Sequence, residues 1–423
     1  MTSNTTRDRQ ATQTARTKRA EQASPLARHF TLGSLLRFAA PSIGMMIIIS
    51  LYTVTDGIFI GRFAGSDALA ASNIVYPVIN LVLGLAIMLA SGGSALVAKN
   101  LGEGKPAAAR RRFTLITIAA VALASALAIL AFAAGDGLLF LLGASPELLA
   151  DCRSCLYALL PFFPFAALMI LFNAFFIADG RPMQGFRVSV LAGLTNAGLD
   201  YFFLAHLGLG VFGAGLATGI ADLLSAVIGL AYFWRSSRTL RFTKPQLEWR
   251  ALGQAMYNGS SELVTQLSVG ITTFLFNILT FRYAGADGVA AISVILYAEM
   301  LLTAIYMGFT NGVAPVFSYR FGARDFGELR RLVRLSLMAI AGGALLSFGL
   351  SRLLAGPLIS LFLPQGGHVY ELTHQGFLLF SLSFLLCGFN LFISGFFTAI
   401  SDGRTSALMS FARNLLGIVI FLL

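Results

Sequence analysis

From Leu35 to the C-terminus, long apolar runs alternate with short polar segments. Eleven of these runs are predicted to be transmembrane helices. Each reaches about 20 residues or more, the length that a helix needs to cross a hydrocarbon core of about 30 Å with its backbone hydrogen bonds satisfied. The predicted spans are residues 35–60, 68–98, 113–134, 154–178, 184–205, 211–234, 252–281, 288–317, 334–362, 374–400 and 405–423.

The composition agrees with a membrane protein. Hydrophobic residues make up 57% of the chain and charged residues only 12%, with a mean hydropathy of +0.79. An ordinary soluble domain contains about 25% charged residues. The N-terminal segment 1–32 differs from the rest, because it is basic and lacks apolar periodicity, and it is predicted to form a disordered tail without a signal peptide.

The net charge of +11 is distributed unevenly between the two sides of the predicted membrane. When loops are assigned alternately to the two sides, 25 Lys and Arg residues fall on the side of the N-terminal tail and four on the other. The positive-inside rule therefore places the tail in the cytoplasm. Because topology explains the basic excess, no nucleic-acid partner is predicted.

Two halves of the chain repeat each other. "RFAGSDALAA", from Arg62, recurs as "RYAGADGVAA" from Arg282. The two copies are therefore 220 residues apart (282 − 62), and this separation is called the offset of the repeat. "LGEGKPAAARRRFTL" recurs at the same offset as "FGARDFGELRRLVRL", and "FFIADGRP" returns as "FFTAISDGRT". Three matches in one order indicate an internal duplication.

The repeat predicts an all-α polytopic membrane protein with two parallel six-helix lobes, related by a pseudo-twofold axis along the membrane normal. The expected divisions are the tail 1–32, an N-terminal lobe 33–235, a cytoplasmic linker 236–250 and a C-terminal lobe 251–423. The sixth span has no counterpart before Leu423. We therefore expect a chain that stops one helix short of six plus six.

Polar residues interrupt two spans of the first half. Asp56 lies in the first span, and Asn196 and Asp200 lie one helical turn apart on one face of the fifth. A carboxylate near the bilayer centre costs about 2.5 to 3.5 kcal/mol on insertion scales, so such groups normally face the bundle interior. Together the three side chains would form an oxygen-rich pocket for a proton or a sodium ion. Alternatively, each acid lies in water at a helix end.

Other spans also contain polar side chains. Thr218 and Asp222, in the sixth span, would add a hydroxyl and a carboxylate to the same pocket. Asp222 is alternatively solvated in a substrate cavity, for which Asn390 is also a candidate. Glu262 and Glu299 either line a substrate cavity, where they would attract cations, or lie at wet helix ends. Arg413, in the last span, would pair with one of these acids.

Pro41 interrupts the hydrogen-bond ladder of the first span and predicts a bend, which is either a moving hinge or a static kink. Cys152 and Cys155 form a C-x-x-C pair without a second pair or a redox context, so neither a metal nor a disulfide is predicted.

Motifs of enzymes are absent from the sequence, which contains no H-E-x-x-H, G-x-S-x-G or Walker-type stretch. Without a nucleotide site, the energy for transport is expected from an ion gradient. No cofactor is predicted apart from a coupling ion, H⁺ or Na⁺.

These features resemble the multidrug and toxic compound extrusion (MATE) family of secondary antiporters. The resemblance covers residues 35–423 and rests on "PSIGMMIIISLYTVTDGIFIGRFAGSDALAA", "GGSALVAKNLGEGK", "ADGRP" and the repeat of this pattern. The first motif looks most like the bacterial subgroup of MepA-type drug exporters. The resemblance implies twelve helices in two lobes, which rock between outward-facing and inward-facing states.

The resemblance also implies a cation site in the N-terminal lobe, where the family's acids match Asp56 and Asp200. Asn196 stands at the accompanying amide position, Thr218 at a hydroxyl position, and Pro41 at the bending proline.

In the C-terminal lobe, Glu262 matches an acid of the NorM-like branch of the family, but Asn390 stands where that branch has an aspartate. The chain therefore favours coupling through the first lobe.

The sequence thus predicts a monomeric exporter of small organic, cationic and amphipathic compounds in the bacterial inner membrane. Two alternatives stay open. A lipid-linked sugar flippase of the wider superfamily would carry more cationic residues in its cavity, and a membrane-embedded enzyme or receptor would lack the duplication.

Overall fold

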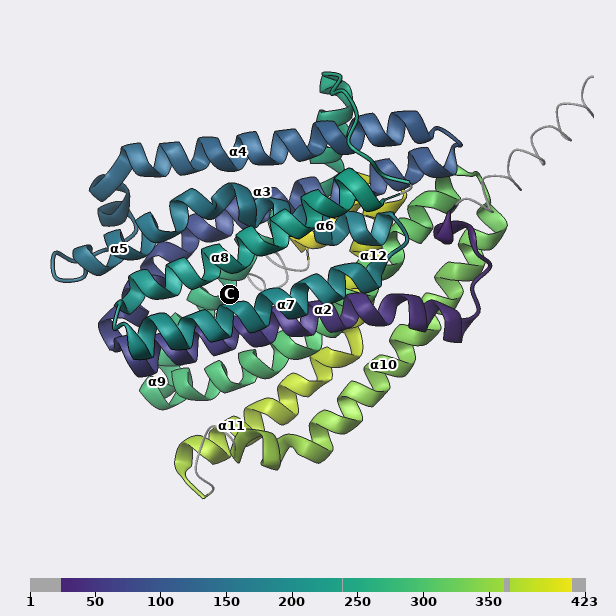
Figure 1. Ribbon diagram of the computed structural model, residues 1–423. Helices are drawn as coiled ribbons and strands as arrows, with labels where there is room; N and C mark the ends of the chain where they lie inside the picture. The colour runs from purple at the N-terminus through teal and green to yellow at the C-terminus, as the bar shows by residue number, and fades with distance from the viewer. Residues whose placement is uncertain (1–23, 238, 361–365, 413–423) are drawn as a thin grey trace, which may run out of the picture.

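The computed structural model describes residues 24–237, 239–360 and 366–412, with only part of the side chains between residues 269 and 290. In this part of the chain all regular secondary structure is helical (Figure 1). The first half contains η1 (Pro25–Ala27), α2 (Leu32–Phe59), η2 (Ile60–Ala64), α3 (Ser66–Gly102), α4 (Pro106–Leu141), α5 (Leu149–Leu159), η3 (Leu160–Phe162), α6 (Phe163–Ala178), α7 (Pro182–Asp200), η4 (Tyr201–His206), α8 (Gly210–Ala231) and η5 (Tyr232–Ser236). The second half contains α9 (Trp249–Gly322), α10 (Phe326–Ser360), α11 (His368–Phe380), η6 (Ser381–Ser383), α12 (Phe384–Ala399) and α13 (Gly403–Phe411).

Nine helices among the described residues are long and apolar enough to cross a membrane. They correspond to the first six predicted spans and to the eighth, ninth and tenth, so the predicted membrane architecture is confirmed. The seventh span lies in α9, whose 74 residues are broken by a non-helical backbone at Gly285. Most of the predicted span 405–423 lies outside the described residues.

The internal repeat is visible in the backbone. Six of the residues with positive φ form three matching pairs at corresponding turns: Gly65 and Gly285, Gly104 and Arg324, and Gly180 and Ser401. The first two pairs have the offset of the sequence repeat (285 − 65 and 324 − 104), and the third exceeds it by one (401 − 180). The chain therefore turns in the same way at the same places in both halves, as the sequence offset predicts.

The two lobes cross at a symmetric contact between α3 and α9. A Cβ atom added to Gly102 would lie 2.0 Å from the carbonyl oxygen of Tyr319, and one added to Gly322 would lie 2.1 Å from that of Lys99. The two glycines are separated by the repeat offset, and so are the two carbonyls (322 − 102 and 319 − 99). The contact is therefore reciprocal, as a twofold axis between the lobes requires.

A second pair of close crossings flanks this axis. A Cβ atom on Gly92 of α3 would lie 2.0 Å from the carbonyl oxygen of Ala255, and one on Gly259 would lie 2.0 Å from that of Met88. On the other side of the axis, a Cβ atom on Gly308 would lie 2.5 Å from a backbone carbon of α2. Glycine allows the backbones of these helices to approach closely because no Cβ separates them.

These crossings lie toward one end of the bundle, which we call the basic end. It carries the Lys- and Arg-rich connections α3–α4, α6–α7 and α9–α10 and the linker between η5 and α9. One hydrophobic core joins both lobes there, for example through Val97 and Leu101 of α3 and Val316 and Phe317 of α9.

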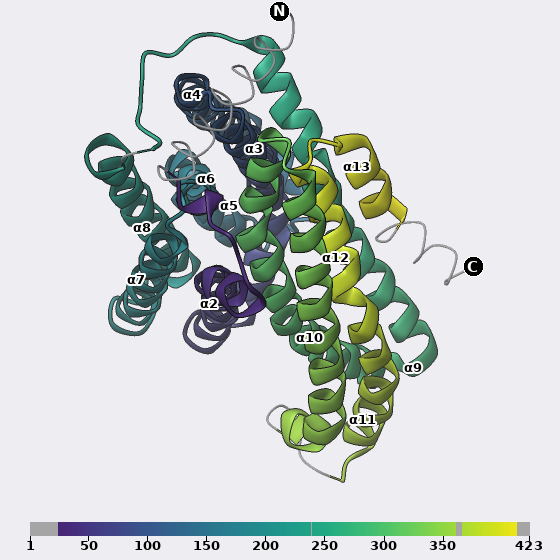
Figure 2. The same cartoon turned by 90° about the vertical axis from the view of Figure 1, so that its right-hand side faces the viewer.

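Toward the opposite end, each lobe has a core of its own. The N-terminal lobe packs around residues such as Val75 and Leu156. The C-terminal lobe packs around a smaller set that includes Ile359 and Phe377. Figure 2 shows the two lobes from another side, with α7 and α8 on one flank and α9, α10 and α12 on the other. The lobes are thus joined at the basic end and have separate cores at the far end.

Residues 24–32 correct the predicted boundary of the disordered tail. Arg320, only 5% exposed, donates to the carbonyl oxygens of Ala27 at 2.5 Å and Arg28 at 2.8 Å, and it forms an ion pair with Asp325 at 3.0 Å. Pro25 packs against Gly180 of the other lobe. This segment is ordered because its backbone satisfies a buried guanidinium, a long-range contact that local composition does not reveal. Residues 1–23 lie outside the described residues.

Candidate functional site

Three neighbouring helices of the N-terminal lobe position the predicted ion-binding residues. α2 packs against α7, and α7 packs against α8 (Figure 1). Counted from Leu32 at about 1.5 Å per residue, Asp56 lies about 36 Å along α2 from the basic end. Asp200 is the last residue of α7, which also starts at the basic end. Both acids therefore lie toward the far end of the lobe.

The structure brings Asp56 and Asp200 together. Their carboxyl groups lie close enough to share a hydrogen bond when one of them is protonated. Asp200 is 0% exposed and Asn196, one helical turn earlier, is 1% exposed, whereas Asp56 is half-buried. Asp200 is thus enclosed by protein, and Asp56 approaches it from the neighbouring helix.

Amide and hydroxyl groups complete this cluster. The Asn196 side-chain nitrogen donates to the hydroxyl oxygen of Thr218 on α8 at 3.3 Å. No donor among the described residues reaches the carbonyl oxygen of Asn196, either carboxylate oxygen of Asp200, or Oδ1 of Asp56. No Lys, Arg or His in the described chain forms an ion pair with these acids.

The cluster therefore holds four buried acceptor oxygens without donors. An unpaired buried polar atom costs about 1 to 3 kcal/mol, more when it is charged. A bound cation removes this cost because it supplies positive charge to several oxygens at once. Proton binding between the two carboxyl groups and sodium coordination by the oxygens both satisfy this chemistry.

A small cavity adjoins the cluster. It has a volume of about 20 Å³, and its lining includes Tyr52, Asn196, Thr218, Asp222 and Ser225. A cavity of this size holds about one water molecule. The hydroxyl of Ser225 is also buried without a partner among the described residues. The cavity thus links Asp222 to the Asn196 side of the cluster.

The sequence interpretation missed the backbone around the two acids. The π-helical segment η2 begins one helical turn after Asp56, and η4 begins directly after Asp200. Phe59, Phe63 and Tyr201 pack together beside these turns, with ring centroids 5.6 to 6.5 Å apart. π-Helical turns are frequent at functional sites. Among 37 phenylalanines, the sequence contains no signal that singles out this aromatic cluster.

The other predicted substrate residues lie in the C-terminal lobe. Glu262 and Glu299 are half-buried on α9. Glu262 has a polar or electrostatic interaction with other residues. Asn390 is exposed on α12. Arg413 lies outside the described residues.

Pro41 is buried inside α2, which continues as one helix through it. The next two residues, Ser42 and Ile43, contact Gly308 of the other lobe. A bend at Pro41 would therefore move an interlobe contact.

Cys152 and Cys155 are buried free thiols. The sulfur of Cys152 lies 3.9 Å from the carbonyl oxygen of Ala71, so it packs α5 against α3.

A second buried carboxylate, Asp179, lies outside the spans, in the "ADGRP" motif. It accepts hydrogen bonds from the Tyr232 hydroxyl at 2.6 Å, the Ser237 hydroxyl at 2.9 Å and the Leu240 backbone at 3.1 Å. Burial raises the pKa of Asp179 above its ordinary value, although the three donors oppose this shift. Asp179 therefore fixes the start of the interlobe linker against the α6–α7 turn.

Two stretches of the chain, residues 41–202 and 263–423, match the family model described as MatE. The chain belongs to the MatE family. One match lies in each lobe, and the separation of their starts (263 − 41) exceeds the repeat offset by only two, as the internal repeat requires. This MatE protein is 22% identical over 389 residues to the multidrug export protein MepA of Staphylococcus aureus, covering 90% of this chain and 84% of the relative. The corresponding protein of Staphylococcus saprophyticus is 22% identical over 384 residues, with the same coverage.

Solved structures have the same fold. A crystal structure of MATE in complex with MaL6 superposes with a TM-score of 0.86 at 21% identity, covering 95% of this chain and 90% of that one. An outward-facing conformation of a multidrug resistance MATE family transporter gives a TM-score of 0.85 at 21% identity, with 92% and 87% covered. At this identity the comparison shows the fold of the MatE protein and its two lobes.

Proposed function

We propose that this MatE protein is a secondary antiporter that exports organic compounds in exchange for H⁺ or Na⁺. Its similarity to proteins named as multidrug exporters supports the export of small molecules. The proposed ion coupling is supported by the cluster of four buried acceptor oxygens without donors at Asp56, Asn196 and Asp200. Such a cluster favours a cation, and no nucleotide-binding motif offers another energy source.

The coupling follows from differential affinity. A cation shifts the equilibrium between two lobe arrangements only if it binds one of them more tightly. Asp56 belongs to α2 and Asp200 to α7, and α2 also packs against α9 of the other lobe. Binding of the ion changes the forces between α2 and α7. Because α2 belongs to both contacts, this change reaches the interlobe contact near Pro41.

The basic end faces the cytoplasm in this proposal, because loops rich in Lys and Arg are retained there. The bacterial plasma membrane is the membrane in question, with the N-terminus on the cytoplasmic side. With the lobes joined at the basic end, the present arrangement is then outward-facing. The ion cluster lies toward the outer end, from which a proton or sodium ion enters down its gradient.

The substrates are proposed to be cationic and amphipathic. Glu262 and Glu299 give the second lobe two half-buried acids, and the chain contains 37 phenylalanines, a side chain whose ring suits flat apolar compounds. Acids within a low-dielectric bundle favour cations over anions.

The test is ethidium efflux from vesicles that contain the purified protein, under separate proton and sodium gradients. Asp200→Asn and Asp56→Asn are expected to abolish ion-driven efflux, because an amide neither ionises nor replaces a carboxylate in cation binding. Asp67→Asn, which changes an exposed acid on α3, is the matched control and should retain efflux. Ion-driven efflux that persists in both site variants removes the cluster from the mechanism. A chain that transports under neither gradient refutes the antiport proposal.

A further inference from the structure

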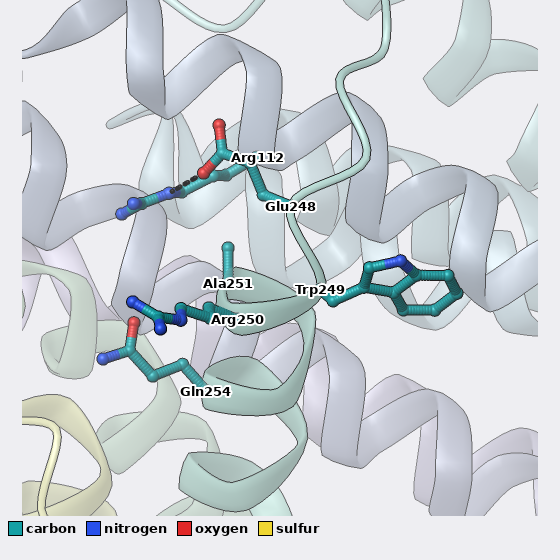
Figure 3. A pocket seen from close by; sticks show the side chains of 6 residues that line it. All are labelled: Arg112, Glu248, Trp249, Arg250, Ala251 and Gln254. Atoms are coloured by element: carbon teal, nitrogen blue, oxygen red, sulfur yellow. Dashed lines mark hydrogen bonds and ion pairs between the residues drawn. The ribbon is translucent and has the colours of Figure 1, made fainter.

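An open hollow of about 800 Å³ lies at the basic end, where the interlobe linker enters α9 (Figure 3). Its lining includes Arg112 of α4, Glu248 of the linker, and Trp249, Arg250 and Gln254 of α9. The two lobes therefore both contribute to it. The hollow is separate from the ion cluster, which lies toward the far end of the bundle.

Some polar side chains of the hollow have hydrogen-bond or ion-pair partners, and others have none. Arg112 forms an ion pair with Glu248 at 3.3 Å and donates to the side-chain oxygen of Asn100 at 2.9 Å. The side chains of Arg250 and Gln254 make no hydrogen bond within the part of the chain that the structure describes. Figure 3 shows the guanidinium groups of Arg112 and Arg250 and the amide of Gln254 on one side of the hollow, with Trp249 directed away.

The lining of the hollow is basic. Arg112 and Arg250 outnumber the single acid Glu248, which gives the lining a net charge of +1 (2 − 1). Further basic residues, Arg110, Arg111, Arg241 and Lys244, lie nearby along the chain. This charge complements an anion.

Exposed apolar side chains beside the hollow suit a membrane surface. Trp249 is 69% exposed and Leu247 is 65% exposed, directly before the predicted seventh span. Tryptophan is enriched at the level of lipid headgroups. An anion bound beside Arg250 is thus at the depth of a phospholipid phosphate, and the exposed apolar side chains border its acyl region.

We propose that this hollow binds the phosphate of an anionic phospholipid headgroup. Arg250 and Gln254 supply the free donors, since the planar guanidinium matches phosphate oxygens with two parallel hydrogen bonds. Arg112 adds positive charge from the other lobe. Basic pockets of this kind on the cytoplasmic side of membrane proteins suit lipid headgroups. A lipid held here contacts both lobes and favours the arrangement in which the starts of α4 and α9 are adjacent.

The test uses Trp249 as a contact reporter. The chain has two tryptophans, and Trp234→Phe leaves Trp249 alone while keeping an aromatic ring beside Phe242. The full chain is reconstituted with acyl-brominated phosphatidylglycerol or phosphatidylcholine, and quenching of Trp249 fluorescence is measured. We expect phosphatidylglycerol to be preferred. Arg250→Gln should reduce that preference about fivefold, as expected for about 1 kcal/mol per basic residue near a membrane surface.

Arg330→Gln is the matched control, because it removes an exposed arginine at the same end but outside the hollow. It should leave the lipid preference unchanged. Equal quenching by the two lipids overturns the proposal, and so does an equal loss in Arg330→Gln, which would indicate a diffuse surface charge. If an excess of inorganic phosphate abolishes the preference, the hollow is a site for free anions rather than for lipid.

Discussion

Adding one methyl group at the symmetric crossing of α3 and α9 should shift the balance between lobe arrangements. In Gly322→Ala, the new Cβ would lie 2.1 Å from the Lys99 carbonyl oxygen. Carbon and oxygen atoms of neighbouring helices normally stay about 3.3 Å apart or more, so the backbones must separate by about 1 Å. Such overpacking costs about 1 to 3 kcal/mol in a well-packed contact.

If the lobes exchange between two arrangements as proposed, the cost applies only to the one in which the basic end is closed. A difference of about 1 to 3 kcal/mol changes an equilibrium constant by about 5 to 150-fold. Gly322→Ala should therefore deplete the closed arrangement. Gly102→Ala should have the same effect, because its Cβ would lie 2.0 Å from the Tyr319 carbonyl oxygen.

The assay is a distance distribution between spin labels at Glu103 and Arg330, two exposed positions at the basic end of opposite lobes. Gly253→Ala is the control, because a Cβ atom there has no neighbour within 4 Å. We expect longer distances in the two crossing variants and an unchanged distribution in the control. Unchanged distances in Gly322→Ala, or an equal change in Gly253→Ala, would refute the packing argument.

Three further predictions concern stability, measured by thermal unfolding in detergent. Arg324→Gly should stabilise the protein by about 1 kcal/mol, because Arg324 has a φ of 56° where its counterpart in the first repeat is glycine. An unchanged stability would show that the backbone at Arg324 is not strained. Asp179→Ala should destabilise by about 3 kcal/mol, since it removes the acceptor of the Tyr232 and Ser237 hydroxyls, whereas the Leu240 backbone keeps Ser237 as a partner; Asp179→Asn should cost less. The raised pKa of Asp179, caused by burial, means that the folded state binds the proton more tightly than the unfolded chain. Its stabilising contribution is present below the unfolded pKa of about 3.9 and is lost as the pH rises through the folded pKa, so Asp179→Asn should flatten the stability curve over that range. Arg320→Met should expose the backbone around Ala27 to hydrogen exchange while the spans stay protected; unaltered exchange would show that Arg320 does not hold this segment.

The order and length of the spans were predictable because they depend on local properties of the chain. A run of about 20 apolar residues has its lowest free energy in the hydrocarbon core, regardless of where neighbouring segments lie. The constant offset between the repeated motifs predicted two similar lobes, and the matching turns at Gly65 and Gly285 confirm it. The cost of an acid in lipid likewise predicted that Asp56 and Asp200 lie inside the bundle.

Tertiary structure alone decided which groups meet. The contact of Gly322 with Lys99, the proton-sharing distance between Asp56 and Asp200, and the order that Arg320 imposes on residues near Ala27 join segments far apart in the chain. They depend on how far each helix is rotated and displaced against its neighbours. That placement follows from many small packing energies summed over the lobes, and no local pattern in the sequence contains such a sum.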